Sequence, residues 1–138
     1  MIVADTNVVW EFLRETPDKC VEGWARGLDV GDLTISVITV EEVERGIGSL
    51  PAGRRRHVLD ERWRSLIDAY ADSVLPYDLP AARATAQILV SRATAGSPMG
   101  LVDAEIAGTC VSRGCQIATR NVRDFEDISG LTVVNPFT

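Results

Sequence analysis

The chain has 138 residues, of which 46% are hydrophobic and 25% are charged, and its formal net charge is −6 at pH 7. This composition is typical of a globular protein, and the length fits one domain, expected to span residues 1–138. The acidic balance argues against a protein that coats nucleic acid by bulk electrostatic attraction, but it does not exclude a nuclease whose metal cations neutralise acidic side chains locally.

The first apolar run, at residues 2–4, predicts a short buried strand. It has no basic flank and is interrupted by Asp5 before it reaches the length of a signal sequence. No later run approaches the roughly 18 apolar residues that a membrane-spanning helix needs. We therefore expect a cytoplasmic protein with no membrane segment.

After this strand, short apolar runs alternate with amphipathic stretches of helical spacing, and Gly114 suits a helix C-terminal cap. Further strands are predicted at 33–38, 73–75, 116–119 and 131–134, and helices at 8–14, 20–28, 39–50, 54–72, 80–95 and 101–113. Short buried strands separated mostly by helices are typical of a parallel sheet covered on both faces. The predicted fold is α/β, a three-layer α/β/α sandwich with a short, mainly parallel sheet of about five strands.

Ligands of open parallel sheets bind beyond the carboxyl ends of the strands, at the point where the strand order reverses. Asp5 follows the first predicted strand, Glu42 lies just past the second, and residues 119–124 follow the fourth. Polar groups from these three places are therefore expected to converge.

Each acid in this set also has an ordinary structural explanation. Asp103 shares a helical stripe with Ala107 and Cys110, where an unpaired charge is costly, so it either binds a cation or caps its helix. Asp5 fits an N-cap after a strand. Thr39 and Glu42 match a capping box. From spacing alone, capping and metal binding both remain open.

Residue types that are missing narrow the chemistry further. His57 is the only histidine, which excludes a two-histidine ribonuclease mechanism and a multi-histidine zinc site. The chain contains neither a phosphate-binding G-x-x-x-x-G-K-[ST] loop nor a G-x-G-x-x-G motif after the first strand. Its three cysteines fit small buried side chains in a reducing compartment. Carboxylates remain, and they select Mg²⁺ or Mn²⁺.

Four motifs in order give the chain a family resemblance over nearly its whole length. They are Asp5-Thr6-Asn7, residues 39–46, residues 102–107 and residues 118–125, followed by Asn135-Pro136-Phe137. With them the sequence resembles PIN-domain proteins, and within that family the VapC and FitB-like toxins of type II toxin-antitoxin systems. The resemblance implies a magnesium-dependent endoribonuclease that is inhibited by a cognate antitoxin and assembles as a homodimer or a toxin-antitoxin hetero-oligomer.

The resemblance also implies site residues. Asp5, Glu42 and Asp103 match the family's acidic metal-site positions, with Mn²⁺ as a possible substitute for Mg²⁺. At the fourth acidic position this chain has Asn121, a neutral donor, and Asp124 is expected to compensate from the next turn. The neutral donor favours one strongly held metal over two. Thr6, Asn7 and Thr119 are expected to hold the carboxylates in place.

Arginines beside the predicted site are candidates for contacting RNA or the antitoxin. Arg120 and Arg123 lie in the fourth motif, whereas the basic run at 54–57 fits a solvated helix face equally well. The three tryptophans are assigned to the core or to a dimer contact.

Two other functions are consistent with parts of the sequence. A PIN-like scaffold with weak or no catalysis, which binds a partner protein, is compatible with Asn121. A magnesium-dependent phosphatase that uses Asp5 fits less well, because residue 7 is asparagine where the D-x-D signature has its second aspartate, and Lys19 is the only lysine.

Overall fold

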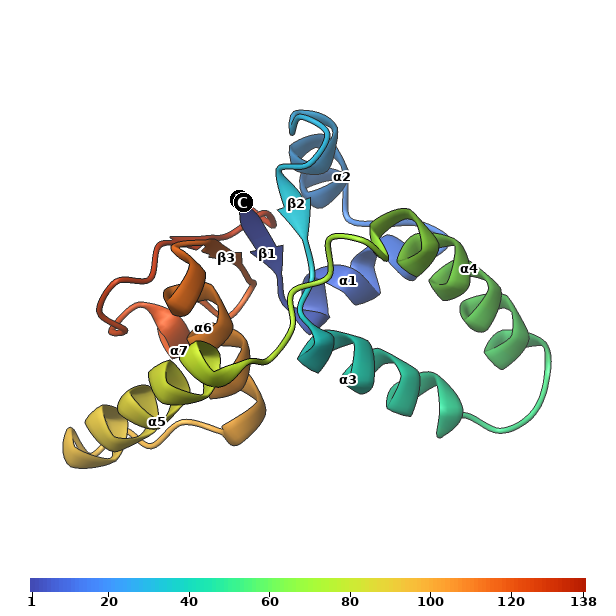
Figure 1. Cartoon of the computed structure of the whole chain (residues 1–138). Helices are drawn as coiled ribbons and strands as arrows, with labels where there is room; N and C mark the ends of the chain where they lie inside the picture. The colour runs from blue at the N-terminus through green and yellow to red at the C-terminus, as the bar shows by residue number, and fades with distance from the viewer.

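Four short strands form one parallel sheet in the order β2-β1-β3-β4 in the computed structural model, which describes residues 1–138 (Figure 1). The strands are β1 (Ile2–Ala4), β2 (Leu33–Thr34), β3 (Gln116–Ala118) and β4 (Val133–Val134). The helices are α1 (Thr6–Leu13), α2 (Lys19–Arg26), α3 (Val37–Gly48), α4 (Arg54–Tyr70), α5 (Leu79–Thr94), α6 (Leu101–Arg113) and α7 (Val122–Phe125).

The sheet is narrower than the sequence predicts, because the segment at 73–75 pairs at one bridge only, between Ser36 and Leu75. The Leu75 amide donates to the Ile35 carbonyl at 2.9 Å, and the Leu75 carbonyl accepts from Val37 at 2.9 Å. Pro76 follows and has no amide hydrogen with which to extend the ladder. A fifth segment therefore lies beside β2 without forming a full strand.

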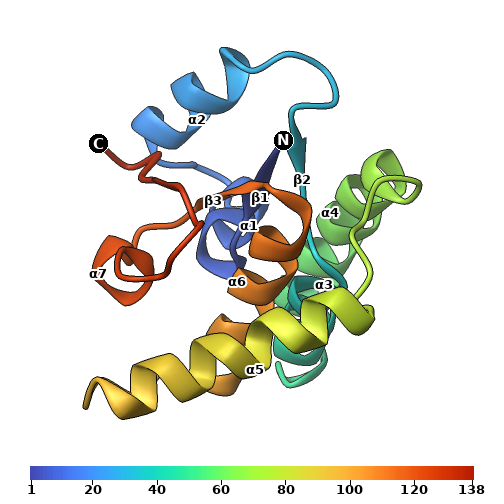
Figure 2. The same cartoon turned by 60° about the vertical axis from the view of Figure 1, so that its left-hand side comes forward.

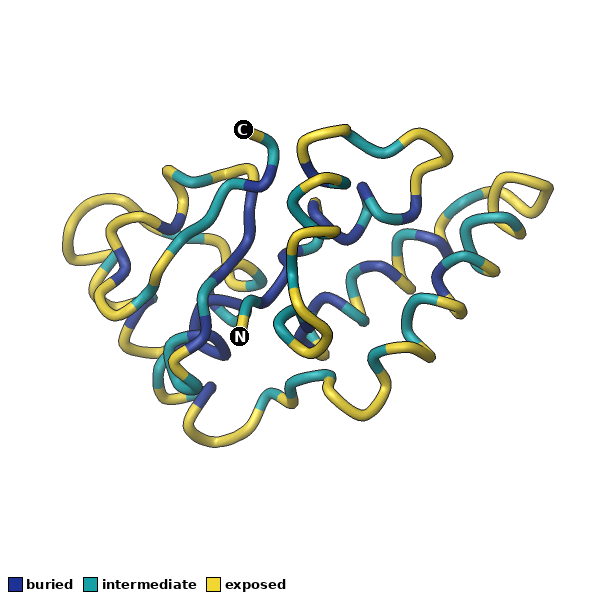
Figure 3. The backbone as a smooth tube through the Cα atoms, turned by 90° about the horizontal axis from the view of Figure 1, so that it is seen from above, coloured by how far each residue is buried: buried dark blue, intermediate teal, exposed yellow.

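Helices cover both faces of the sheet, as the three-layer prediction requires (Figures 1 and 2). On one face Val3 and Ile117 pack with α5, α6 and α7, in a core that includes Ile106 and Phe125. On the other face Ala4 and Ala118 pack with α1 to α4, in a core that includes Trp63. Figure 3 shows these buried stretches in the middle of the molecule and the exposed ones along loops and outer helix faces. Alternate strand residues thus feed two separate cores.

Most helix boundaries lie within a few residues of the predicted ones, and α3 begins two residues before the predicted start at residue 39. Ser36 is its N-cap, and the Ser36 side-chain oxygen accepts from the Thr39 amide at 3.3 Å. Thr39 therefore lies inside the helix, and the predicted capping box of Thr39 and Glu42 is wrong. Because Ser36 starts the helix, β2 is also shorter than the predicted strand at 33–38.

A short α7 follows β3, where the sequence predicts no helix. At the end of α6 the prediction is confirmed, since Gly114 adopts a left-handed conformation with φ 66°. None of the helices combines the length and the apolar character needed to cross a membrane.

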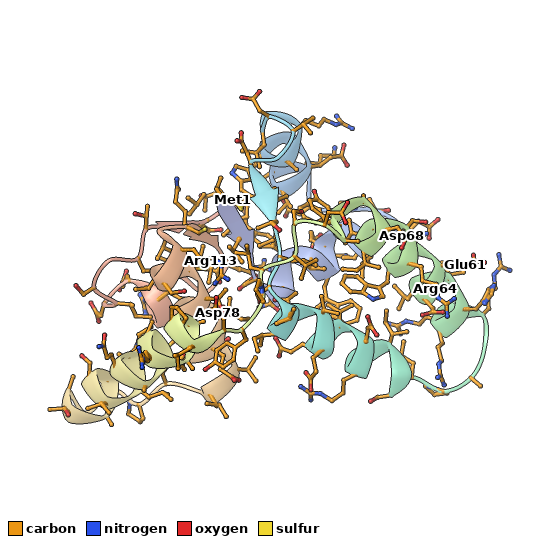
Figure 4. The ribbon with its side chains drawn as sticks, viewed as in Figure 1. Met1, Glu61, Arg64, Asp68, Asp78 and Arg113 are labelled. Atoms are coloured by element: carbon orange, nitrogen blue, oxygen red, sulfur yellow. The ribbon has the colours of Figure 1, made fainter.

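Helices α5 and α6 pack closely around Gly108. A Cβ atom built on Gly108 would lie 2.8 Å from the Thr85 amide nitrogen and 2.9 Å from the Ala81 carbonyl oxygen, so only glycine fits without a shift of backbone. At one end of the pair the Arg113 guanidinium binds the Asp78 carboxylate at 2.9 Å (Figure 4). The position of α6, which carries Asp103, therefore depends on this contact with α5.

We expect Gly108→Ala to lower the free energy of unfolding by about 1–3 kcal/mol, because the added methyl group forces the two backbones apart. Urea unfolding followed by tryptophan fluorescence measures the change. Gly23→Ala in α2 is the matched control, since its added Cβ meets no atom within 4 Å and helix propensity favours alanine by up to about 1 kcal/mol. Equal stability of Gly108→Ala and wild type would contradict the packing argument.

Candidate active site

The candidate site lies where β1 and β3 end side by side. From β1 the sheet extends to β2 on one side, and from β3 it extends to β4 on the other, so the strand order reverses between β1 and β3. Asp5 follows β1, and its amide donates to the Ala118 carbonyl at 3.0 Å. Thr119 follows β3, and its amide donates to the Val134 carbonyl at 2.9 Å. This is the location at which such sheets bind ligands.

Asp5 is both a helix cap and a buried acid. Its Oδ1 atom accepts from the Val8 amide at 3.0 Å at the start of α1, and the residue is only 6% exposed. Burial raises the pKa of the Asp5 carboxyl above its usual range, and the nearby Asp103 charge raises it further, whereas the Thr119 hydroxyl and the Val8 amide lower it. The predicted cap is confirmed, and it uses one of the two carboxylate oxygens.

Glu42 faces the site from α3. Its Oε1 atom accepts a hydrogen bond from the Thr6 hydroxyl, and the Thr6 hydroxyl oxygen lies 3.5 Å from the Thr39 hydroxyl oxygen. Because Ser36 caps the helix, Glu42 is not needed there. Its carboxylate is instead held against the first turn of α1, one residue after Asp5.

Asp103 lies in the first turn of α6 but makes no capping hydrogen bond; the N-cap is Gly100. Its side chain is exposed, so the expectation that it faces packed protein is wrong. Its neighbours Ala104, Ile106 and Ala107 fill the core instead. Desolvation raises the pKa of the Asp103 carboxyl, with further contributions from the charges of Asp124 and then Glu42. Asp103 therefore borders the same acidic region as the other carboxylates.

The segment after β3 contributes Asn121 and Asp124, both exposed. The Asn121 amide donates to the Thr119 hydroxyl oxygen at 3.0 Å, and its side chain makes no capping hydrogen bond to α7. Asp124 lies one turn later and is the acid with the largest charge effect on the pKa of Asp103. The fourth negative charge of the region thus comes from residue 124.

Together the four acids form one electrostatic unit, hereafter the acidic cluster: Asp5, Glu42, Asp103 and Asp124. Each of them either has its pKa raised by another member or raises that of another member. In the side-chain positions of the structure, no three of these carboxylates lie close enough together to hold one ion between them.

The remaining predicted site residues lie around this cluster. Thr6 contacts Glu42, and Thr119 contacts Asp5. Asn7 has an exposed side chain and acts on Asp5 through its backbone amide. Arg123 is exposed on α7, whereas Arg120 stacks over the Phe137 ring at 4.7 Å from its centroid.

Residues outside the predicted site also have defined contacts. The Trp63 indole donates to Glu44 at 3.1 Å, which places this tryptophan in the core, while Trp10 and Trp24 pack partly buried against the same core. In the basic run on α4, His57 pairs with Glu61. A groove of about 750 Å³ is lined by residues that include Phe12, Leu28 and Tyr70, and none of the acidic cluster contributes to it.

Sequence reasoning missed Arg92 in α5. Its guanidinium donates to the Asp124 carbonyl at 2.8 Å and to the Ser97 carbonyl at 2.9 Å. No local pattern points to this arginine, because the contact with Asp124 joins residues 32 positions apart. Only the packing of α5 beside α7 makes the contact.

Comparison with known protein families matches residues 2–131 to the PIN domain. The chain belongs to the PIN-domain family. It is 38% identical to the "VapC ribonuclease Y4jK" of Sinorhizobium fredii, over 99% of this chain and 98% of that protein. It is 36% identical to the "Toxin FitB" of Neisseria gonorrhoeae, over 99% of both chains.

The fold comparison agrees with the family assignment. The crystal structure of FitAcB from Neisseria gonorrhoeae superposes with a TM-score of 0.91, at 36% identity and with 99% of both chains covered. The resemblance of this PIN-domain chain to VapC and FitB proteins is therefore confirmed, and so is the α/β fold.

We expect Asp5→Asn to be more stable than wild type at pH 7 in buffer that contains EDTA. Burial raises the pKa of Asp5 in the folded protein above its ordinary value of 3.8, so the folded state binds the proton more tightly than the unfolded state. The free energy of unfolding therefore falls as the pH rises from 3.8 through the pKa of Asp5 in the folded protein. Asparagine removes the charge and keeps an oxygen to cap α1.

Urea unfolding at several pH values tests this expectation. The difference between the two proteins should shrink as the pH falls below 3.8, where Asp5 is protonated in both states. Asp68→Asn, at an exposed position on α4, is the control and should show no such difference (Figure 4). A less stable Asp5→Asn protein at pH 7 would contradict the argument.

Proposed function

We propose that this protein is a magnesium-dependent endoribonuclease that acts as the toxin of a type II toxin-antitoxin pair. The observation that carries the proposal is the acidic cluster at the strand-order reversal, in a PIN-domain chain similar over nearly its full length to a VapC ribonuclease and a FitB toxin. RNA is the proposed substrate, and residues 1–138 form the one proposed domain.

The donor set of the cluster fits a hard divalent cation. Carboxylate oxygens are the ligands that Mg²⁺ and Mn²⁺ prefer, and Asp5 and Asp103 are the proposed main ligands. Desolvation is the largest cause of the raised pKa of both carboxyls, followed by the Asp103 charge for Asp5 and by the Asp124 and Glu42 charges for Asp103, and a bound cation relieves this repulsion. Glu42, Asp124 and the neutral Asn121 complete the proposed donor set, which favours one strongly held ion.

The protein's own groups have distinct tasks in hydrolysis of the phosphodiester. When bound, a magnesium ion would lower the pKa of water and neutralise negative charge on the attacked phosphate. Glu42, which the Thr6 hydroxyl holds in one orientation, is the proposed group that orients the attacking water and accepts its proton. Thr119 and the first turn of α1 fix the Asp5 carboxylate.

An antitoxin is the proposed partner, and the proposed assembly is a homodimer or a toxin-antitoxin hetero-oligomer. The support is the similarity to the protein named Toxin FitB and to the structure of FitAcB. Arg120 and Arg123 are exposed residues in the segment that also carries Asp124, and we propose that their guanidinium groups bind phosphate groups of RNA.

A second candidate function is a PIN-like scaffold with weak or no catalysis. It is favoured by one observation, that the fourth acidic position of the family is Asn121 in this chain. Asp124 provides a fourth negative charge near Asp103, and this charge favours the nuclease over the scaffold.

Expression of wild type, Asp5→Asn and Asp68→Asn in bacterial cells, with mapping of RNA ends, separates these two functions. For a nuclease, wild type and Asp68→Asn should arrest growth and produce new RNA ends, and Asp5→Asn should do neither, because the principal metal ligand is lost. Growth arrest and RNA ends that are the same with Asp5→Asn would contradict the nuclease mechanism.

Thermal unfolding provides a test that does not need the RNA substrate. Ligands that bind only the folded state stabilise it, so Mg²⁺ should raise the midpoint of wild type and of Asp68→Asn in a concentration-dependent way. It should not raise that of Asp5→Asn. An equal response of all three proteins would mean that Mg²⁺ binds elsewhere.

Replacement of Arg120 and Arg123 by glutamine should lower the affinity for RNA and make that affinity less dependent on salt concentration. Each phosphate contact that is lost from a single strand should reduce the slope of log affinity against log salt by about 0.7. Arg83→Gln, an exposed arginine on α5, is the control. Binding of a synthetic RNA is measured with proteins that also carry Asp5→Asn, so that the RNA is not cleaved. A slope of log affinity against log salt that does not change would contradict the assignment of Arg120 and Arg123 as phosphate contacts.

A further inference from the structure

Arg92 joins three segments of the chain with one side chain. It belongs to the last turns of α5, and its Nη1 atom donates to the Asp124 carbonyl of α7 at 2.8 Å. Its Nε atom donates to the Ser97 carbonyl at 2.9 Å, and its Nη2 atom lies 3.4 Å from the Ser97 hydroxyl oxygen. Its Nη1 atom also lies 3.9 Å from the Met99 sulfur. The segment at 97–99 leads directly into α6.

Of the two connected segments, α7 carries one member of the acidic cluster, and residues 97–99 lead into the helix that carries another. Asp103 is the third residue of α6, four residues after Met99, and Asp124 is itself the residue whose carbonyl Arg92 binds. The two carboxylates repel each other: after desolvation, the Asp124 charge is the next cause that raises the pKa of Asp103. In a site without a cation, this repulsion favours separation of α7 from the start of α6. The Arg92 guanidinium opposes the separation because it binds α7 and the segment that leads into α6.

The short α7 needs such an external contact. A helix of four residues is too short to be stable by its own backbone hydrogen bonds. The buried Phe125 ring anchors α7 to the core, but an apolar contact is not directional. The hydrogen bond from Arg92 to Asp124 is directional, so it fixes how the turn that carries this carboxylate is oriented.

Arginine is suited to this task because of its fork of donors. Nε, Nη1 and Nη2 of Arg92 are all directed at acceptors in the two segments, and none of the carboxylates in the protein pairs with this guanidinium. A lysine would present a single ammonium group on a flexible stem and could not bridge the same acceptors in a fixed geometry.

We propose that Arg92 is a positioning residue that holds Asp124 beside Asp103 and thereby sets the affinity of the acidic cluster for a divalent cation, without itself contacting the cation or RNA. This inference rests on the proposed function, since it assumes that the cluster binds a metal. It assigns to α5, which carries no site acid, an indirect part in metal binding, through the position of Asp124.

Titration of the protein with Mn²⁺, followed by water proton relaxation, tests the inference. Loss of a residue that orients a metal ligand weakens metal binding by about 10-fold or more, so Arg92→Gln should raise the Kd for Mn²⁺ by about 10-fold. Arg92→Lys should raise it nearly as much, because the charge alone is not enough. Arg83→Gln, on the same helix, should leave the Kd unchanged.

A double-mutant cycle separates positioning from a general loss of structure. Asp124→Asn keeps the carbonyl that Arg92 binds but removes the carboxylate, so adding Arg92→Gln to it should cause little further loss of Mn²⁺ affinity. Cleavage of RNA by Arg92→Gln should return to the wild-type rate at saturating Mn²⁺. Amide hydrogen exchange at residues 121–126 should become faster in Arg92→Gln and Arg92→Lys than in Arg83→Gln.

The outcomes that overturn the inference differ from those that overturn the proposed function. An unchanged Kd in Arg92→Gln, or losses from Arg92→Gln and Asp124→Asn that add fully, would refute the positioning role while the metal site stands. If Asp5→Asn binds Mn²⁺ as tightly as wild type, or wild type does not bind it, the proposed metal site falls and this inference falls with it. If Arg92→Gln does not fold, the same criteria apply to Arg92→Lys.

Discussion

Parallel pairing of β1 with β3 holds the two halves of the chain together and creates the site at the same point. Val3 lies beside Ile117 and Ala4 beside Ala118, so alternate residues of both strands enter the two cores on opposite faces of the sheet. Where the paired strands stop, the chain diverges into α1 and into the segment that leads to α7. Asp5 and Thr119 come to lie side by side because the residues before them are paired.

This arrangement concentrates negative charge where water is partly excluded. Asp5 is buried and Asp103 is desolvated despite its exposed side chain, and the charges of Glu42 and Asp124 add to the effect. Such a cluster destabilises the folded chain unless a cation or proton is bound. The surrounding groups offset part of this destabilisation through the Val8 amide, the hydroxyls of Thr6 and Thr119, and the forked contact of Arg92.

Sequence patterns predict the features that depend on neighbouring residues. Apolar runs and helical spacing predict the strands and most helices, Gly114 predicts the end of α6, and the position of Asp5 after a strand fits a cap, which the structure confirms. The family resemblance implies Asp5, Glu42 and Asp103 as site acids, with Asp124 expected to compensate for the neutral Asn121. Features that depend on competition between overlapping signals were missed: Ser36 displaced Thr39 as the cap, and Pro76 limited a predicted strand to one bridge.

Local sequence patterns also do not predict contacts between segments that are distant along the chain. Helical spacing placed Asp103 on a packed stripe, but the way α6 sits against α5 and the sheet leaves its first turn at the surface. The sequence around Arg92 is that of an ordinary arginine near a helix end, and its contact with Asp124 arises only because α7 lies beside the end of α5. In both cases tertiary packing decides the environment, and local periodicity carries no information about it.

The pairing of the first strand with a late one also has a consequence for biosynthesis. Ile2 pairs with Gln116, so the two innermost strands meet only after residues up to 118 have left the ribosome. Contacts of such large sequence separation form slowly, because the intervening chain must first lose conformational entropy. A nascent chain therefore cannot assemble the acidic cluster until Asp124, the last of its members along the chain, has been synthesised.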